Sequence, residues 1–164
     1  METTSGRLHS SAQKVADAAR ELGLVIEIVE FEQTTRSAPE AAEAIGTTLA
    51  QIVKSLCFTV AGQPVIALVS GVNQLDERKL AQLQGVGRKQ VKRADAEVVK
   101  KATGFSIGGV PPFGHLTKLP IYVDEDLLQF EVVWAAAGTP FAVFAIAPED
   151  LVRGCGGTAV GLKK

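Results

Sequence analysis

The amino-acid sequence predicts an α+β fold, a small mixed β-sheet or β-barrel flanked by short helices, in a single domain over residues 1–164. Three observations support this prediction. The chain has 164 residues, 46% of them hydrophobic, which is enough for one core but not for two domains of ordinary size. Segments with helical periodicity alternate with short apolar, β-branched runs. The pattern also lacks the long helical crossovers of a doubly wound parallel sheet.

The N-terminal part predicts two helices separated by a strand. Residues 11–22 carry apolar side chains at helical spacing and end before Gly23, a favourable helix stop. The run LVIEIVEF, residues 24–31, predicts a strand because it is apolar and rich in β-branched residues. Ser37 has the character of an N-cap, so a short alanine-rich helix is expected from there to Gly46.

The middle of the chain predicts a hairpin followed by two capped helices. VKSLCFTV (residues 53–60) and PVIALVS (residues 64–70) are separated by a short polar turn, so the two strands are expected to pair. Asp76 and Asp95 each precede a helical segment as an N-cap, and residues 87–94 between those segments form a basic strand.

The C-terminal part predicts three strands and a final helix after a glycine- and proline-rich loop. The loop, GFSIGGVPPFGH, covers residues 104–115, and the helix begins at Pro148. The strands are expected in LPIYVDE, EVVWAAAG and TPFAVFAIA.

The loop is the first candidate site. Gly108 and Gly109 permit positive φ angles and a close approach of another molecule, and the prolines that end at Pro112 make the backbone rigid. Such a loop is able to direct the N–H groups of Gly109 and Val110 at one acceptor oxygen. The alternative is a stiff connection whose Phe113 fills the core. The loop is not a phosphate-binding P-loop or a GxGxxG fingerprint.

The charge distribution is the second feature. The net charge is -1, which argues against indiscriminate nucleic-acid binding, yet residues 78–101 hold about six net positive charges. A local basic stripe suits a polyanion that docks on one face, although such stripes are commonly only solvated surface. We expect contacts with nucleic acid from Arg88, Lys92 and Arg93.

Composition excludes several other classes of protein. The longest apolar runs have five or six residues, far below the roughly 20 needed to cross a bilayer, so no membrane association is expected. The N-terminus has no apolar signal core, which predicts a cytoplasmic protein. Cys57 and Cys155 lack the spacing of a metal site, so neither a metal nor a cofactor is expected.

Lys54 is the third feature, because it interrupts the apolar stretch IVKSLCF. A partly buried ammonium is costly unless it meets an anion or a carbonyl oxygen. The alternative is that the lysine buries its stem and keeps its ammonium in water.

These features together resemble the YbaK/EbsC family of aminoacyl-tRNA deacylases, which are related to the editing domain inserted in bacterial prolyl-tRNA synthetases. The resemblance covers nearly the whole chain and is carried by the lysine of IVKSL and by a GxxxP element, here Gly108 to Pro112. Matching stretches include SAPEAAEAIG, SGVNQLDERKL, KRADAEVVKKATGFSIGGVPPFGH, LPIYVDEDLL and VWAAAGTPFAVFAI.

The resemblance implies a free-standing trans-editing deacylase, which hydrolyses the ester of a mischarged small amino acid, of the cysteine or alanine class, on a tRNA such as proline tRNA. It implies that Lys54 is essential to activity, and that Gly108, Gly109 and Pro112 position the aminoacyl group and support the oxyanion. Family mechanisms use a hydroxyl or thiol of the substrate itself. We expect His115 to be a general base, a support of the loop or a substrate contact.

Further candidates contact the substrate. Asp124 matches a recurrent aspartate and has two open roles, binding an amino group or capping a helix. Ser55 lies beside the lysine. Ser70 and Phe113 are candidate lining residues, together with Ile66, Leu68 and Phe105.

The expected partners are a mischarged tRNA and a prolyl-tRNA synthetase, while the oligomeric state is left open. Two alternatives to the enzyme are a non-catalytic module that binds the tRNA end and a small-molecule sensor of the same fold. Retention of both the lysine and the loop favours the enzyme.

Overall fold

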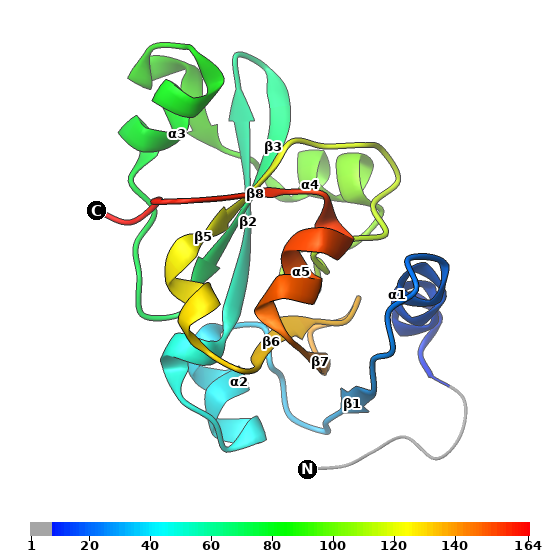
Figure 1. Cartoon of the computed structure of the whole chain (residues 1–164). Helices are drawn as coiled ribbons and strands as arrows, with labels where there is room; N and C mark the ends of the chain where they lie inside the picture. Colours follow the sequence, from blue (N-terminus) through cyan, green and yellow to red (C-terminus); the bar gives the residue numbers. More distant parts are fainter. Residues whose placement is uncertain (1–7) are drawn as a thin grey trace.

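The computed structural model describes residues 8–164, which form two β-sheets with short helices packed around them (Figure 1). The helices are α1 (Ser10–Glu21), α2 (Ala38–Ile45), α3 (Glu77–Gln84), α4 (Ala96–Thr103) and α5 (Pro148–Cys155). The strands are β1 (Ile28–Glu30), β2 (Val53–Val60), β3 (Gln63–Ser70), β4 (Val91–Arg93), β5 (Ile121–Asp124), β6 (Val133–Ala136), β7 (Ala142–Ile146) and β8 (Thr158–Val160). Short 3₁₀ turns cover Leu49–Gln51, Arg88–Gln90 and Glu125–Gln129.

The sheet topology confirms the predicted mixed α+β class. One sheet has the order β4-β2-β3-β5-β8 and the other has the order β1-β7-β6. In the larger sheet β3 and β5, like β5 and β8, run parallel, whereas the other pairs are antiparallel. A parallel bridge between Ile52 and Trp134 joins the two sheets. Over the described residues neither sheet closes on itself, so the architecture is two open sheets rather than a barrel.

The predicted helix ends are confirmed, because their capping residues act as expected. Ser37, Asp76 and Asp95 each accept a hydrogen bond from a main-chain N–H in the first turn of α2, α3 and α4, respectively. Gly46 and Gly104 end α2 and α4 in the left-handed conformation that glycine adopts without strain.

The predicted hairpin is also confirmed, with β2 and β3 paired from Val53 opposite Ser70 to Val60 opposite Gln63. Three strand predictions differ from the structure. Of the expected basic strand at residues 87–94, only Val91–Arg93 form a strand, and Arg88–Gln90 form a 3₁₀ turn. Only Ile28–Glu30 of the expected residues 24–31 pair as a strand, since the partner strand β7 is opposite those three residues alone. Strand β8 was not predicted, because three residues are too few to show an alternating pattern.

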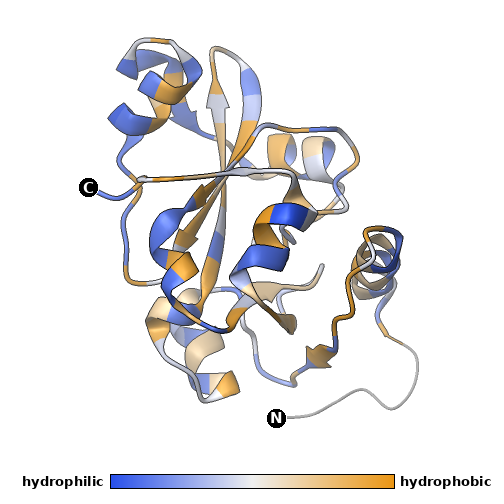
Figure 2. Cartoon of the chain, viewed as in Figure 1, coloured by the Kyte–Doolittle hydropathy of each residue, from blue (hydrophilic) through white to orange (hydrophobic). Residues whose placement is uncertain are grey.

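Two hydrophobic clusters lie on opposite faces of the larger sheet. Val53 and Cys57 of β2 belong to the cluster between the sheets, and Phe58 and Val60 belong to the cluster beneath α3. This division follows from the alternation of side chains along a strand. Figure 2 shows orange, apolar residues along strands such as β1 and blue, hydrophilic residues on helices such as α3. No helix within residues 8–164 is long and apolar enough to span a bilayer.

Candidate functional site

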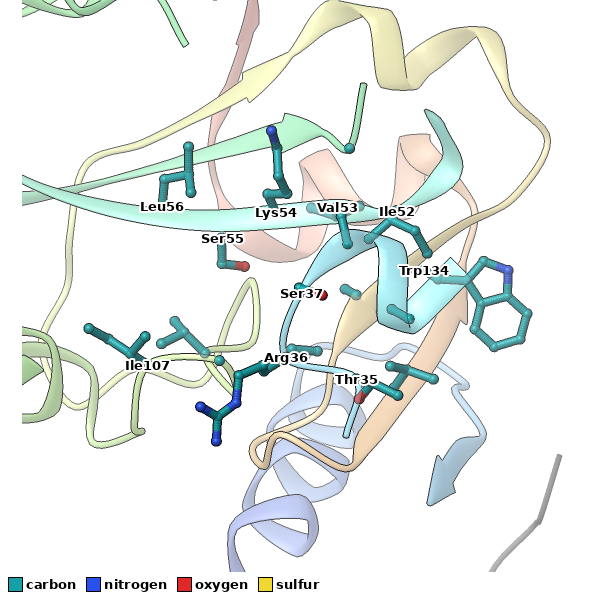
Figure 3. A pocket seen from close by; sticks show the side chains of 18 of the residues that line it. Thr35, Arg36, Ser37, Ile52, Val53, Lys54, Ser55, Leu56, Ile107 and Trp134 are labelled. Carbon is teal, nitrogen blue, oxygen red and sulfur yellow. The ribbon is translucent and has the colours of Figure 1, made fainter. Parts of the chain in front are cut away.

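A cavity of about 440 Å³ lies where the two sheets meet. Its walls come from four segments that are far apart in the sequence: the chain entering α2, the first half of β2, the loop at residues 107–110, and β6 (Figure 3). A smaller recess of about 50 Å³ adjoins the cavity. Its own lining residues are Cys57, Ala94 and Val99, and it shares Ser55, Arg93, Ile107, Gly108 and Val110 with the cavity. The geometry therefore provides a chamber with a small apolar extension.

The cavity borders a part of β2 that has no strand on one side. Strand β4 pairs only with Phe58–Val60, and the last contact on this edge is the Ala94 N–H, which donates to the Cys57 carbonyl at 3.0 Å. Main-chain groups of every second residue in a strand face the same edge, so the N–H and C=O of Ser55 face the open edge as Cys57 does. The sheet thus presents polar main-chain groups to the cavity.

Ser55 is the unusual residue of this wall. Its Oγ is buried and has no hydrogen-bond partner within the described part of the chain. In Figure 3 its side chain points to the side of β2 where Arg36 and Ile107 lie. A buried hydroxyl without a partner is costly, which is characteristic of a group that awaits a ligand.

Lys54 lines the same cavity, but its side chain extends from the opposite face of β2 (Figure 3). Its ammonium donates to the carbonyl of Asn73. Burial lowers the pKa of Lys54, the charge of Arg93 lowers it further, and Asp124 acts in the other direction. The lysine is therefore tied to a carbonyl, as its position in an apolar stretch led us to expect, and does not stand freely in the chamber.

The charges around the cavity all have one sign. Its lining includes three cationic side chains and no carboxylate among the described residues. The cations are Arg36, Lys54 and Arg93. An apolar cavity lined by cationic residues favours an anionic or electron-rich ligand.

The predicted loop contributes Gly108 and Val110 to the walls, whereas Gly109 and Pro112 lie outside them. The expectation that the Gly109 N–H holds an oxyanion is wrong, because this N–H donates to the Ser106 carbonyl at 3.0 Å. Gly109 is instead a packing residue: a Cβ there would lie 2.8 Å from three main-chain atoms of Thr139. Within residues 8–164, the N–H groups of Gly108 and Val110 donate to no protein acceptor.

Of the three roles expected for His115, its contacts fit the support of the loop. Its Nε2 lies 2.7 Å from the carbonyl oxygen of Pro111, so this nitrogen carries the proton and donates it. The side chain does not line the cavity, and burial lowers the pKa of His115. The residue braces the loop rather than facing the chamber.

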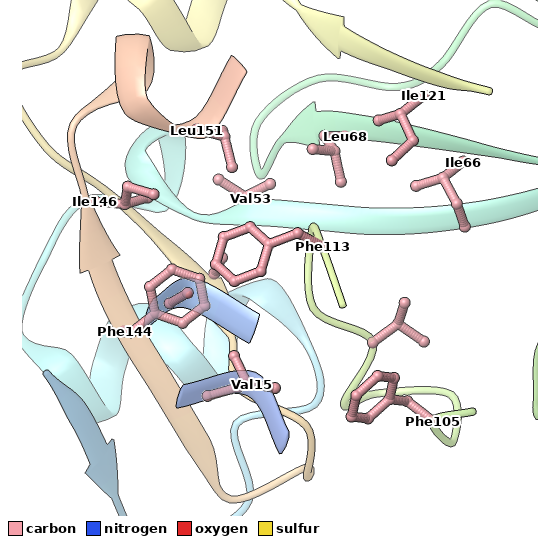
Figure 4. Close-up of a cluster of buried hydrophobic side chains, with 14 of the residues drawn as sticks. Val15, Val53, Ile66, Leu68, Phe105, Phe113, Ile121, Phe144, Ile146 and Leu151 are labelled. Atoms are coloured by element: carbon pink, nitrogen blue, oxygen red, sulfur yellow. The ribbon is translucent and has the colours of Figure 1, made fainter. Parts of the chain in front are cut away.

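Three predicted substrate contacts lie elsewhere. Phe113 is 3% exposed and packs against Phe144 with ring centroids 5.6 Å apart, which makes it a core residue (Figure 4). The Ser70 hydroxyl donates to the Ala50 carbonyl at 2.6 Å. Asp124 caps the turn at residues 125–129 and accepts from the Ser70 N–H at 3.0 Å, so its structural role is the one observed. Ile66, Leu68 and Phe105 are likewise buried in the core.

Of the three predicted nucleic-acid contacts, one side chain forms an ion pair within the protein and two are exposed. Arg88 pairs with Glu77 and also donates to the Val91 carbonyl. Lys92 and Arg93 are exposed on β4, where the Arg93 guanidinium lies 5.5 Å from the Phe58 ring centroid. Arg93 alone of the three reaches the cavity.

Arg36 and Trp134 were missed by the sequence analysis. Arg36 directly precedes the N-cap of α2, where the helix dipole disfavours a cation. This unfavourable position is the feature of the sequence that could have identified Arg36 as a site residue. Trp134 had no local signal, because its strand is brought to the cavity by the bridge to Ile52. No cluster of three metal-ligating side chains occurs in residues 8–164.

Comparisons with known proteins agree on one family. A family model described as aminoacyl-tRNA editing domain matches residues 32–153. The candidate Cys-tRNA(Pro)/Cys-tRNA(Cys) deacylase EbsC of Enterococcus faecalis is 31% identical over 118 residues, which are 71% of this chain and 70% of EbsC. A proline–tRNA ligase of Maridesulfovibrio salexigens is 40% identical over 97 residues, 59% of this chain but only 16% of the ligase.

A solved structure shows the same fold. The crystal structure of a candidate trans-editing enzyme for prolyl tRNA synthetase superposes with a TM-score of 0.90 and 44% sequence identity. The match covers 96% of this chain and 99% of that one.

Proposed function

Because this chain belongs to the aminoacyl-tRNA editing domain family, we propose that it hydrolyses the ester between a mischarged small amino acid, of the cysteine or alanine class, and a tRNA. The observation that carries the proposal is the cavity beside Ser55, which is lined by a residue with a buried, unpartnered hydroxyl and by the cationic residues Arg36 and Arg93, while the Lys54 ammonium lies on the opposite face of β2. Such a space suits a polar ester attached to a polyanion.

The reaction needs few protein groups because an ester is already activated. Water adds to the ester carbonyl carbon, the bond to the ribose oxygen breaks, and the proton of the water ends on that oxygen. The lining holds no imidazole or carboxylate among the described residues, so we assign the role of proton acceptor to the vicinal ribose hydroxyl of the substrate. The free N–H groups of Gly108 and Val110 are the proposed donors to the developing oxyanion.

The recess behind Ser55 supports a small amino acid. At about 50 Å³ it exceeds the ≈ 30 Å³ that one water occupies in the liquid, and its apolar wall suits a methyl or thiol group. Discrimination by one methylene in such a space is about 1–3 kcal/mol, so neighbouring small amino acids are expected to differ by rates of tenfold or more.

The proposed binding partners and domain organisation of the chain are those of its family. We propose that the chain acts as one editing domain on mischarged proline tRNA in the cytoplasm, with a prolyl-tRNA synthetase as its protein partner. The exposed Lys92 and Arg93 are the proposed contacts to the tRNA body and its end. Arg88 contributes less, because its guanidinium is already paired with Glu77.

The test is release of labelled amino acid from proline tRNA charged with alanine, cysteine, serine, 2-aminobutyrate or proline. We expect selective release of one small amino acid by the wild type and a loss of most activity in Lys54→Met, since the ammonium supplies positive potential and holds the Asn73 segment. Lys14→Met, an exposed change on α1, is the matched control. Equal rates of release by the wild type and Lys54→Met would contradict the proposed role of the lysine.

The alternative is a module that binds the tRNA end without turnover. The absence of an imidazole or a carboxylate from the described cavity lining is the observation that favours it. The same assay separates the two functions: bound tRNA with no release from any of the five substrates identifies the binding module.

A further inference from the structure

Two arginines from distant segments reach the same cavity. Arg36 lies on the segment that enters α2, and Arg93 is the last residue of β4. Both side chains are exposed, and neither guanidinium forms an ion pair or a hydrogen bond with any group described in residues 8–164. Arg153, by contrast, pairs with a carboxylate of its own helix, at 2.8 Å. The two cavity arginines are thus uncompensated.

Each arginine is held by the surrounding structure. The residue before Arg36 is anchored, because the Thr35 N–H donates to the Pro140 carbonyl at 2.6 Å. Gly108 has a φ of +92° and lies so close that a Cβ there would be 2.9 Å from the Cβ of Arg36. The Arg93 guanidinium lies over the Phe58 ring, 5.5 Å from the ring centroid. Fixed stems reduce the entropy that binding a ligand would cost.

The electrostatic surroundings do not neutralise these guanidinium groups. Glu40 is the carboxylate whose pKa Arg36 helps to lower, but its oxygens are already engaged by the hydroxyls of Thr34 and Ser37, which are the larger causes of that shift. The charge of Arg93 also acts on Lys54 and Cys57. Burial lowers the pKa of Lys54 and Arg93 lowers it further, whereas burial raises the pKa of Cys57 and Arg93 opposes that shift. Guanidinium groups bind phosphate through paired N–H donors, which makes phosphate the matching ligand.

We propose that Arg36, from the Ser55 face of β2, and Arg93, from the Phe58 face, bind the phosphate on the 5′ side of the terminal adenosine across the open edge of β2 and so place the ester against Ser55. The inference deepens the proposed function, on which it rests, by assigning a phosphate subsite at the cavity mouth and a role for Arg36. It also gives Gly108 a second purpose, since any side chain there would displace the arginine.

The test compares two minimal substrates that differ only in this phosphate: the 3′(2′)-O-alanyl ester of adenosine and the 3′(2′)-O-alanyl ester of adenosine 5′-monophosphate. We expect Arg36→Gln and Arg93→Gln each to lower kcat/KM for the phosphorylated ester by about tenfold or more relative to that for the unphosphorylated ester, the usual effect of losing a charged hydrogen bond. Arg36→Lys should recover part of the loss, since it restores the charge but not the paired donors. Arg153→Gln, outside the cavity, should behave as wild type on both.

Equal losses on the two esters, or no loss on either, would overturn the phosphate assignment while leaving the deacylase function intact. If the wild type hydrolyses neither ester, calorimetric titration with AMP and with adenosine measures whether the 5′-phosphate adds to the affinity. If the protein binds AMP more tightly than adenosine, and Arg36→Gln removes this difference, the subsite is supported. Equal affinities for AMP and adenosine refute it. Circular dichroism of each variant separates these outcomes from a failure to fold.

Discussion

Replacing Ser55 by alanine is expected to make the protein more stable and less active. The Oγ of Ser55 is buried without a partner, and such a group costs about 1–3 kcal/mol. We take the lower end, about 1 kcal/mol, because the hydroxyl borders a cavity. For a chain of this length, a gain of about 1 kcal/mol raises Tm by roughly 2–4 °C.

Ser70→Ala is the matched control, because it removes the same atom from the neighbouring strand. The Ser70 hydroxyl is also buried, but it donates to the Ala50 carbonyl at 2.6 Å. Its removal loses a satisfied hydrogen bond, worth about 1 kcal/mol, and leaves a carbonyl without that donor. Tm should therefore fall by roughly 2–4 °C, in the direction opposite to Ser55→Ala.

The assay is thermal unfolding by circular dichroism at one pH, with deacylation rates measured on the same samples. Opposite signs of the Tm change, with activity lost in Ser55→Ala, would show that the hydroxyl is kept for the ligand at the expense of stability. A lower Tm for Ser55→Ala would mean that the hydroxyl has a partner in the free protein, and an unchanged rate would mean that it does not touch the substrate. Either result refutes the reasoning.

Two further predictions concern the loop. Gly109→Ala should lower stability by about 2 kcal/mol, because its Cβ meets the main chain of Thr139, whereas Gly87→Ala, with open space around it, should be neutral; equal denaturant midpoints for the two variants would contradict the packing argument. The lowered pKa of His115 means that below about pH 6.5 the unfolded chain takes up a proton that the folded chain refuses, so wild-type stability falls as the pH drops through this window. His115→Gln, whose amide N–H is able to donate to Pro111, should lose less stability between pH 7.5 and 5.5 in urea titrations, and an identical loss would exclude the histidine as the cause.

Features that depend on neighbouring residues were predictable from the sequence. The caps at Ser37, Asp76 and Asp95 act within one helical turn, so a short sequence window contains the whole interaction. The β2–β3 hairpin is fixed by two apolar runs and the short turn between them. The family was also identified from local stretches, the lysine of IVKSL and the loop that contains Gly108, and the family model confirms it.

Which residues line the cavity depended on contacts between segments that are far apart in the sequence. Phe113 and Gly109 were expected to meet the substrate, but one packs on Phe144 and the other on Thr139, about 30 residues further along the chain. Whether a loop residue faces a cavity or the core is decided by the segment that packs against it.

The sequence by itself therefore determined the class of fold, the ends of its helices, the main hairpin and the family, because each depends on local conformational preference or on a contiguous motif. Only the tertiary structure decided that β2 has an open edge beside Ser55, that the Ser55 hydroxyl lacks a partner, and that Arg36 joins Arg93 at the cavity. The physical reason is that a binding site is a property of the space between segments, and that space is set by how the two sheets and the loop pack together.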